Sequence, residues 1–135
     1  MKIFITGVAG FLGSHLADLM ISEGHTVAGN DNMIGGYTDN VPQDVEFHQV
    51  DCCNLENMTK AMEGCDIVYH TAATAYEGLS VFSPVLVTRN IFEASVTTIT
   101  AAIRNKVKRI VYCSSMARYG HHDKMPYKED YECRP

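Results

Sequence analysis

Short apolar runs alternate with segments of helical period along this chain, and this alternation restricts the possible folds more than any other feature of the sequence. The apolar runs cover residues 2–6, 26–30, 45–50, 66–70 and 109–113. Between them, leucines recur at helical spacing from Leu12 onward, and further helices are predicted over 54–64 and 83–105. Apolar strands that alternate with helices are typical of a parallel sheet covered on both faces. We therefore expect an α/β fold with a doubly wound parallel sheet of about five strands.

Composition narrows the range of partners and compartments. The 135 residues are 46% hydrophobic and 20% charged, which is ordinary for a globular protein. The net charge of −5, with no basic cluster beyond "RNKVKR" at 104–109, argues against nucleic acid as a partner. There is no apolar run of about 18 residues, so we expect no membrane association. Five cysteines in no framework spacing favour reduced thiols, and hence a cytoplasmic location.

The regular spacing of apolar residues ends after Cys113, so residues 114–135 read as a loop. Loops of that length are uncommon in compact domains and normally lead to another element. We therefore expect the domain over 1–135 to be incomplete on its C-terminal side.

A glycine turn, "TGVAGFLGSHL" at 6–16, directly follows the first apolar run and opens the first helix. Its glycines stand at positions 7, 10 and 13. A phosphate that approaches a helix start needs exposed backbone N–H groups with no Cβ in the way, and glycines at these points supply both conditions. A tight turn without a ligand is the alternative reading of the glycines alone.

The second apolar run, "TVAGNDN" at 26–32, favours the ligand reading, because it ends in Asp31. A carboxylate at the end of this strand accepts hydrogen bonds from the ribose hydroxyls of a bound dinucleotide and repels a 2′-phosphate. No arginine stands beside Asp31 to hold such a phosphate. The pattern predicts a Rossmann-like dinucleotide-binding domain over 1–135, with NAD rather than NADP as cofactor.

Here the chain resembles the extended short-chain dehydrogenase/reductases, specifically the NAD-dependent epimerase/dehydratase family of the UDP-galactose 4-epimerase type. The likeness runs the whole length of the chain. Besides the glycine turn and "DN" at 31–32, it rests on "VDCCNL" at 50–55, "IVYHTAAT" at 67–74, Asn90, "RIVYCSSMARYG" at 109–120 and "MPYKED" at 125–130. The family usually has a Gly-Thr pair shortly after the asparagine, and here Glu93 and Ala94 stand instead.

The resemblance implies roles for particular residues. Asp51 and the backbone at Cys52 would meet the adenine, and the small Ala72 and Ala73 would let the dinucleotide lie close to the backbone. The residues that we predict to bind the cofactor are Gly7, Gly10, Phe11, Leu12, Gly13, Asp31, Asn32, Asp51, Cys52, Ala72, Ala73, Thr74 and Asn90.

The resemblance also implies a catalytic serine, Ser115, that hydrogen-bonds the reacting oxygen while a tyrosine in a Tyr-x-x-x-Lys helix acts as acid/base. A hydroxyl that merely caps the end of the strand is the alternative reading of this serine. The tyrosines from position 112 onward are followed, four residues later, by Met116, Asp123, Tyr131 and Pro135 in place of lysine. We therefore expect the partner of Ser115 to belong to a segment that residues 1–135 lack, together with the substrate domain.

Two functions remain open from the sequence. The first is the NAD-binding portion of a nucleotide-sugar epimerase/dehydratase that acts by hydride transfer at a sugar carbon, in which case 1–135 alone is inactive. The second is a catalytically silent dinucleotide-binding module or sensor. A homodimer through the helix 83–105 is a further expectation. We expect no metal, because "HHD" at 121–123 and Cys133 offer no second ligand pair at zinc spacing.

Overall fold

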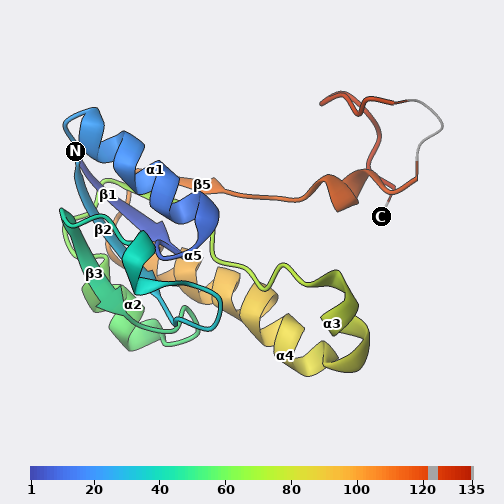
Figure 1. Cartoon of the computed structure of the whole chain (residues 1–135), viewed down its shortest axis with the longest axis horizontal. Coiled ribbons are helices and arrows are strands. Elements are labelled where there is room, and N and C mark those ends of the chain that lie inside the picture. The colour runs from blue at the N-terminus through green and yellow to red at the C-terminus, as the bar shows by residue number, and fades with distance from the viewer. Residues whose placement is uncertain (122–124, 135) are drawn as a thin grey trace.

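The fold is a parallel α/β sheet, which confirms the expectation from the sequence. A computed structural model describes residues 1–121 and 125–134 (Figure 1). Its strands are β1 (Lys2–Thr6), β2 (Thr26–Asp31), β3 (Val45–Gln49), β4 (Ile67–His70) and β5 (Arg109–Tyr112). They pair side by side in the order β3-β2-β1-β4-β5, and every pairing is parallel. The chain order of the strands therefore reverses beside β1, between β2 and β4, and ligands bind at such a point in open α/β sheets.

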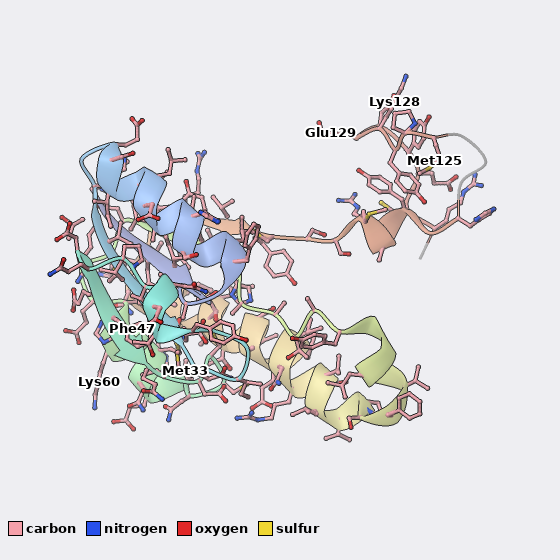
Figure 2. The ribbon with its side chains drawn as sticks, in the orientation of Figure 1. Met33, Phe47, Lys60, Met125, Lys128 and Glu129 are labelled. Atoms are coloured by element: carbon pink, nitrogen blue, oxygen red, sulfur yellow. The ribbon has the colours of Figure 1, made fainter. Side chains whose placement is uncertain are left out.

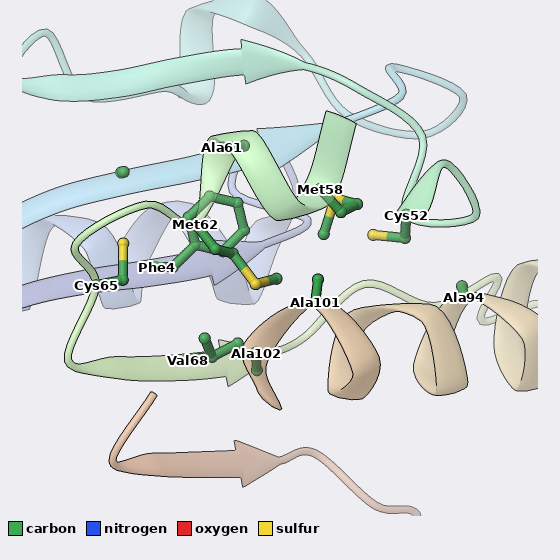
Figure 3. Close-up of a cluster of buried hydrophobic side chains, with 11 residues drawn as sticks. Phe4, Cys52, Met58, Ala61, Met62, Cys65, Val68, Ala94, Ala101 and Ala102 are labelled. Atoms are coloured by element: carbon green, nitrogen blue, oxygen red, sulfur yellow. The ribbon is translucent and has the colours of Figure 1, made fainter. Parts of the chain in front are cut away.

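Helices cover both faces of the sheet. On one face, α1 (Phe11–Ser22) packs over Ile3, Ile5 and Val27, with Ala17 at the contact. On the other face, α2 (Leu55–Ala61) and α5 (Ala94–Arg104) enclose a second cluster of buried side chains around Phe4 (Figure 3). The second cluster is rich in small and sulfur-containing residues; its members are Phe4, Ala28, Cys52, Met58, Ala61, Met62, Cys65, Val68, Ala94, Ala101 and Ala102.

Two helix boundaries follow from local chemistry. The Asn54 side chain accepts a hydrogen bond from the Asn57 N–H and so caps the start of α2. After α1, Gly24 takes a positive φ of 80°, which lets its N–H bond the Ile21 carbonyl and turns the chain toward β2. Asn54 thus fixes where α2 begins, and Gly24 fixes where α1 ends and the chain turns into β2.

The helix predicted over 83–105 is present from Pro84 to Arg104, but it contains a π-helical turn that was not predicted. The structure has α4 (Pro84–Thr88), then one π-helical turn, η2 (Arg89–Glu93), and then α5. A further short helix, α3 (Glu77–Phe82), precedes them and was not predicted. Ser83 does stand at the N-cap position before Pro84, but its side chain makes no capping hydrogen bond. The π turn matters for the site, because it faces the ends of the strands.

The segment after β5 leaves the sheet and runs away from the α/β body (Figure 1). It contains a short 3-10 helix, η3 (Met116–Tyr119), and a further loop. Figure 2 shows Met125, Lys128 and Glu129 on this segment, far from Met33, which follows β2. Within the described residues no helix is long and apolar enough to cross a membrane.

Candidate functional site

A cavity of about 340 Å³ lies at the carboxyl ends of β1, β2 and β4, where the strand order reverses. The glycine turn, the loops after β2 and β4 and the π turn form its walls. Its lining residues are Gly7, Gly10, Phe11, Leu12, Gly13, Asn30, Asp31, Asn32, Ile34, Gly35, Gly36, Asp51, Cys52, Thr71, Ala72, Ala73, Thr74, Ala75, Tyr76, Asn90 and Ala94. Every residue that the sequence predicted to bind a cofactor is among them. The fold thus brings these residues to one place, although it contains no ligand that would test their roles.

The three glycines of the turn meet different constraints. Gly7 has a positive φ of 70°, and a Cβ there would lie 2.9 Å from Ala72 Cα. A Cβ on Gly13 would lie 2.1 Å from the Gly7 carbonyl oxygen, so the start of α1 packs directly on the turn. A Cβ on Gly10 would meet only that same oxygen, at 3.2 Å. Packing therefore accounts for Gly7 and Gly13, whereas Gly10 is explained best by a ligand that approaches the helix start.

Asp31 lies at the end of β2 with 8% of its surface exposed. One carboxylate oxygen accepts a hydrogen bond from the Ala9 N–H at 3.2 Å, and the other accepts one from the Met33 N–H at 2.8 Å. These bonds join the carboxylate to the glycine turn on one side and to the following loop on the other. The side chain is therefore held at the cavity wall, beside the first turn of α1.

Asp51, which follows β3 and lines the cavity, forms an ion pair with Arg89, with Arg89 Nη1 3.2 Å from Asp51 Oδ2. Partial burial raises the pKa of Asp51, but a hydrogen bond from the Cys53 N–H and the charge of Arg89 outweigh it, so the net pKa is lowered. The carboxylate is therefore ionised at neutral pH. The neighbouring thiols stay protonated. Burial, and after it the contacts with Asp51, raises the pKa of Cys53 to about 12. Burial also raises the pKa of Cys52.

The π turn brings Asn90 to the cavity. Its side-chain amide donates a hydrogen bond to Thr74 Oγ1 at 3.1 Å, which ties the turn to the loop after β4. Ala94, which stands where the family usually has a small residue pair, is buried and also lines the cavity. Glu93 is exposed, so this departure from the family pattern places no charge in the cavity.

Several lining residues were missed by the sequence reasoning. Ile34, Gly35 and Gly36 fold back over the cavity in the loop after β2, and their double glycine was the available signal. Thr71 and Tyr76 flank the alanines after β4. Nothing in the local pattern distinguished these two residues, because the loop that carries them gains its position only from contacts with the rest of the fold.

Ser115 does not line this cavity. It is exposed, and its Oγ accepts a hydrogen bond from the Ala117 N–H at 3.1 Å, so it caps η3. A serine that caps a short helix is close to the simpler of the two readings offered by the sequence, and its catalytic role stays a prediction. The described residues contain no group of three or more His, Cys, Asp or Glu placed to hold a metal ion. His122 and Asp123 of the "HHD" stretch lie outside the described residues.

The comparison with known families decides what this arrangement is. The model of the NAD dependent epimerase/dehydratase family matches residues 3–135. The chain belongs to this family. The resemblance noted from the motifs is thereby confirmed.

Individual relatives agree with this assignment. The chain is 32% identical to a probable UDP-arabinose 4-epimerase 3 of Arabidopsis thaliana, over 94% of this chain and 34% of the relative. It is 30% identical to a UDP-glucose 4-epimerase of Corynebacterium glutamicum, over 100% of this chain and 41% of that enzyme. The chain therefore spans well under half the length of these relatives.

Solved structures give the same result for the fold. A UDP-glucose 4-epimerase of Thermus thermophilus, in complex with NAD, superposes with a TM-score of 0.93 at 32% identity, over 100% of this chain and 45% of that chain. A UDP-glucose 4-epimerase of Brucella ovis, also in complex with NAD, gives a TM-score of 0.93 at 29% identity, over 99% of this chain and 42% of that chain. The sheet and the glycine turn are thus those of the epimerase/dehydratase family.

Proposed function

We propose that this chain is the NAD-binding portion of a nucleotide-sugar epimerase/dehydratase, which acts by hydride transfer at a sugar carbon. The observation that carries the proposal is the cavity at the strand-order reversal, which gathers the glycine turn and Asp31. The start of α1 would hold the pyrophosphate on its backbone N–H groups, with Gly10 leaving room for it. The bound dinucleotide would supply the hydride-accepting group, and the chain's own residues would bind and orient it.

Asp31 carries the preference for NAD. Its carboxylate is buried at the cavity wall, and among the lining residues no arginine or lysine offers a 2′-phosphate a countercharge. Calorimetric titration of the chain with NAD⁺ and with NADP⁺ tests this. We expect NAD⁺ to bind at least tenfold more tightly, and Asp31→Asn, which removes the charge but keeps an acceptor for one backbone bond, to narrow the gap. Equal affinity of the unsubstituted chain for NAD⁺ and NADP⁺ would refute the proposal.

The catalytic part of the proposal concerns Ser115. In the whole enzyme its hydroxyl would bond the reacting oxygen, and a tyrosine from a Tyr-x-x-x-Lys helix beyond residue 135 would move the proton. Ser115 is exposed, on a segment that runs away from the α/β body, and this supports a site completed by further chain. We propose that the substrate domain, and with it the choice of nucleotide sugar, lies in that further chain.

A silent dinucleotide-binding module or sensor is the second candidate. It is favoured by one observation: no tyrosine within 1–135 has a lysine four residues after it in the part of the sequence that follows β5. Reading the coding DNA past codon 135 separates the two. An open frame that encodes Tyr-x-x-x-Lys supports the enzyme, and a stop codon at that point supports the module.

We also propose a homodimer through the helical segment 83–105. Apolar side chains along it are largely exposed, with Val85 at 82%, Phe92 at 68% and Ile103 at 70%. A second copy of the chain would cover this stripe. Sedimentation velocity tests it: Phe92→Glu should shift the species toward monomer, whereas Arg104→Glu, an exposed change at the end of α5, should not. If the unsubstituted chain is monomeric at high micromolar concentration, this proposal fails.

We also propose a cytoplasmic location for the protein, which the free thiols of its cysteines support.

A further inference from the structure

A buried chain of hydrogen bonds runs through His70 and joins β1 to α5. Thr6 Oγ1 lies 2.8 Å from His70 Nδ1, and His70 Nε2 lies 2.9 Å from Ser95 Oγ. Ser95 Oγ in turn lies 2.6 Å from the Ile91 carbonyl oxygen. The three side chains are buried, with exposed fractions of 0% for Thr6, 3% for His70 and 9% for Ser95. We call Thr6, His70 and Ser95 the histidine relay.

The partners at each end fix the direction of every proton in the relay. The Ile91 carbonyl can only accept, so the Ser95 hydroxyl donates to it and its oxygen accepts the His70 Nε2–H. At the other end, Thr6 Oγ1 already accepts hydrogen bonds from the N–H groups of Thr71 and Ala72, each at 3.1 Å. Its own proton is therefore free to go to His70 Nδ1. The arrangement requires a neutral imidazole with its proton on Nε2.

The relay connects three walls of the cavity. Thr6 directly precedes Gly7, and Ala72 packs against Gly7 so closely that a Cβ on the glycine would lie 2.9 Å from Ala72 Cα. The Thr6 hydroxyl orients the Ala72 N–H, and so sets how the loop after β4 meets the glycine turn. At the far end, Ile91 follows Asn90 in the π turn. The position of each wall is thus coupled to the others through one imidazole.

Protonation of His70 disturbs this arrangement. Burial lowers the pKa of His70, so its charged form is disfavoured in the folded chain. From β1 and α5 the hydroxyls of Thr6 and Ser95 face the ring, and from β5 the Tyr112 ring lies with its centroid 5.5 Å away. A second proton on Nδ1 would point at Thr6 Oγ1, which already accepts two N–H bonds and would lose the acceptor of its own proton. Release of one of the two N–H donors, Thr71 or Ala72, would relieve that crowding, and either release moves the loop after β4.

We propose that neutral His70 is a positioning residue, which holds the glycine turn, the loop after β4 and the π turn at the spacing that dinucleotide binding needs, and that its protonation weakens that binding. The inference rests on the NAD binding proposed above. His70 itself is not among the residues that line the cavity, so it would act through its neighbours.

Paired substitutions in the relay test the proposal. Thr6→Ser keeps the hydroxyl, and Thr6→Val removes it at nearly constant shape. By calorimetry at pH 7.5, we expect Thr6→Ser to bind NAD⁺ within about threefold of the unsubstituted chain, and Thr6→Val about tenfold or more weakly. Thr59→Val, which removes the hydroxyl of a partly buried threonine of α2 outside both the relay and the cavity lining, should leave the affinity unchanged. Folded Thr6→Val that binds as tightly as Thr6→Ser would overturn the proposal.

Two further measurements keep the test decisive if Thr6→Val does not fold. Nitrogen-15 NMR of the histidine rings should show His70 neutral and protonated at Nε2 at pH 7.5, and protonation at Nδ1 would overturn the inference. Because burial lowers the pKa of His70, the dissociation constant for NAD⁺ should rise only at pH values below the ordinary histidine pKa of about 6.5, by at most tenfold per unit, and His70→Gln should remove that rise. An unchanged rise in His70→Gln would also overturn it. If the unsubstituted chain binds no NAD⁺, the proposed function fails, while the NMR result still decides the relay.

Discussion

Alanine substitutions at Gly10 and Gly13 separate the packing role of the glycine turn from its ligand role. A Cβ at Gly13 would lie 2.1 Å from the Gly7 oxygen, 2.8 Å from Gly7 C and 2.9 Å from Val8 Cα. Relief of these contacts requires the start of α1 to move by about 1 Å, which corresponds to overpacking that costs about 1–3 kcal/mol. For a domain of this size, where 1 kcal/mol corresponds to about 4 °C, the melting temperature should fall by about 4–12 °C.

Gly10→Ala should behave in the opposite way. Its Cβ meets only the Gly7 oxygen at 3.2 Å, and Gly10 has an extended conformation, with φ −84° and ψ 174°, that alanine also adopts. Exchange of glycine for alanine at an N-cap costs less than about 1 kcal/mol, so we expect the melting temperature to fall by no more than about 4 °C. The added methyl group occupies the approach to the N–H groups of α1, so NAD⁺ should bind at least about tenfold more weakly.

The assay is differential scanning fluorimetry together with calorimetric titration of NAD⁺, on both variants and on Gly78→Ala. Gly78 is a suitable control, because a Cβ there meets nothing within 4 Å and the residue does not line the cavity. It should leave both measurements unchanged. The reasoning is refuted if Gly10→Ala binds NAD⁺ as tightly as the unsubstituted chain, or if Gly13→Ala has the same melting temperature as the unsubstituted chain.

Three other predictions concern catalysis and the thiols. The first uses an enzyme extended through the Tyr-x-x-x-Lys helix and the substrate domain. In it, Ser115→Ala should lower kcat by about 10²–10³, because one transition-state hydrogen bond is lost, and should leave the affinity for NAD unchanged. A comparable loss of kcat in Ser114→Ala would contradict the assignment. Residues 1–135 alone should turn over no nucleotide sugar above a blank preparation, because the acid/base tyrosine is missing. Cys53, whose pKa is raised to about 12 chiefly by burial, should resist iodoacetamide at pH 8, while the exposed Cys113 is alkylated; mass spectrometry of the digested protein decides this.

The sheet could be predicted from the sequence nearly to the residue, because each strand is a short apolar run with a helical segment or a turn signal on either side. Residues 26–30 were predicted and Thr26–Asp31 is observed; residues 109–113 were predicted and Arg109–Tyr112 is observed. Buried parallel strands satisfy their hydrogen bonds with their neighbours, so local pattern and tertiary environment agree there. The glycine turn was equally accessible, since its geometry is set within a few residues.

The π turn and α3 could not be predicted in this way. One extra residue in a helical turn does not change the type of residues in a stripe, so Val85, Phe92 and Val96 fit a regular α-helix as well as a helix that contains a π turn. What distinguishes the two is tertiary: the Asn90 amide reaches Thr74, and the Arg89 side chain reaches Asp51. Such contacts come from segments distant in sequence, and no local pattern reports them.

The histidine relay also escaped prediction, although "IVYHTAAT" was recognised as a motif. A histidine in an apolar strand shows its role only when its two ring nitrogens can be paired with named partners. Thr6 and Ser95 stand 64 and 25 residues from His70 in the chain. Parallel pairing of β1 with β4 places Thr6 directly beside His70, and this register makes the relay.

The position of β1 between β2 and β4 has a consequence for the rate at which backbone amides exchange with deuterium. Strand β1 is paired on both sides, and Ile3, Phe4 and Ile5 are at most 1% exposed, so their amides can exchange only when the whole sheet opens. Strand β5 is paired on one side in the described part of the chain, and three of its four residues are exposed, so its amides can exchange by local opening. The glycine turn is therefore attached to an inner, slowly exchanging strand of the sheet, and the segment that carries Ser115 to a strand whose amides exchange faster.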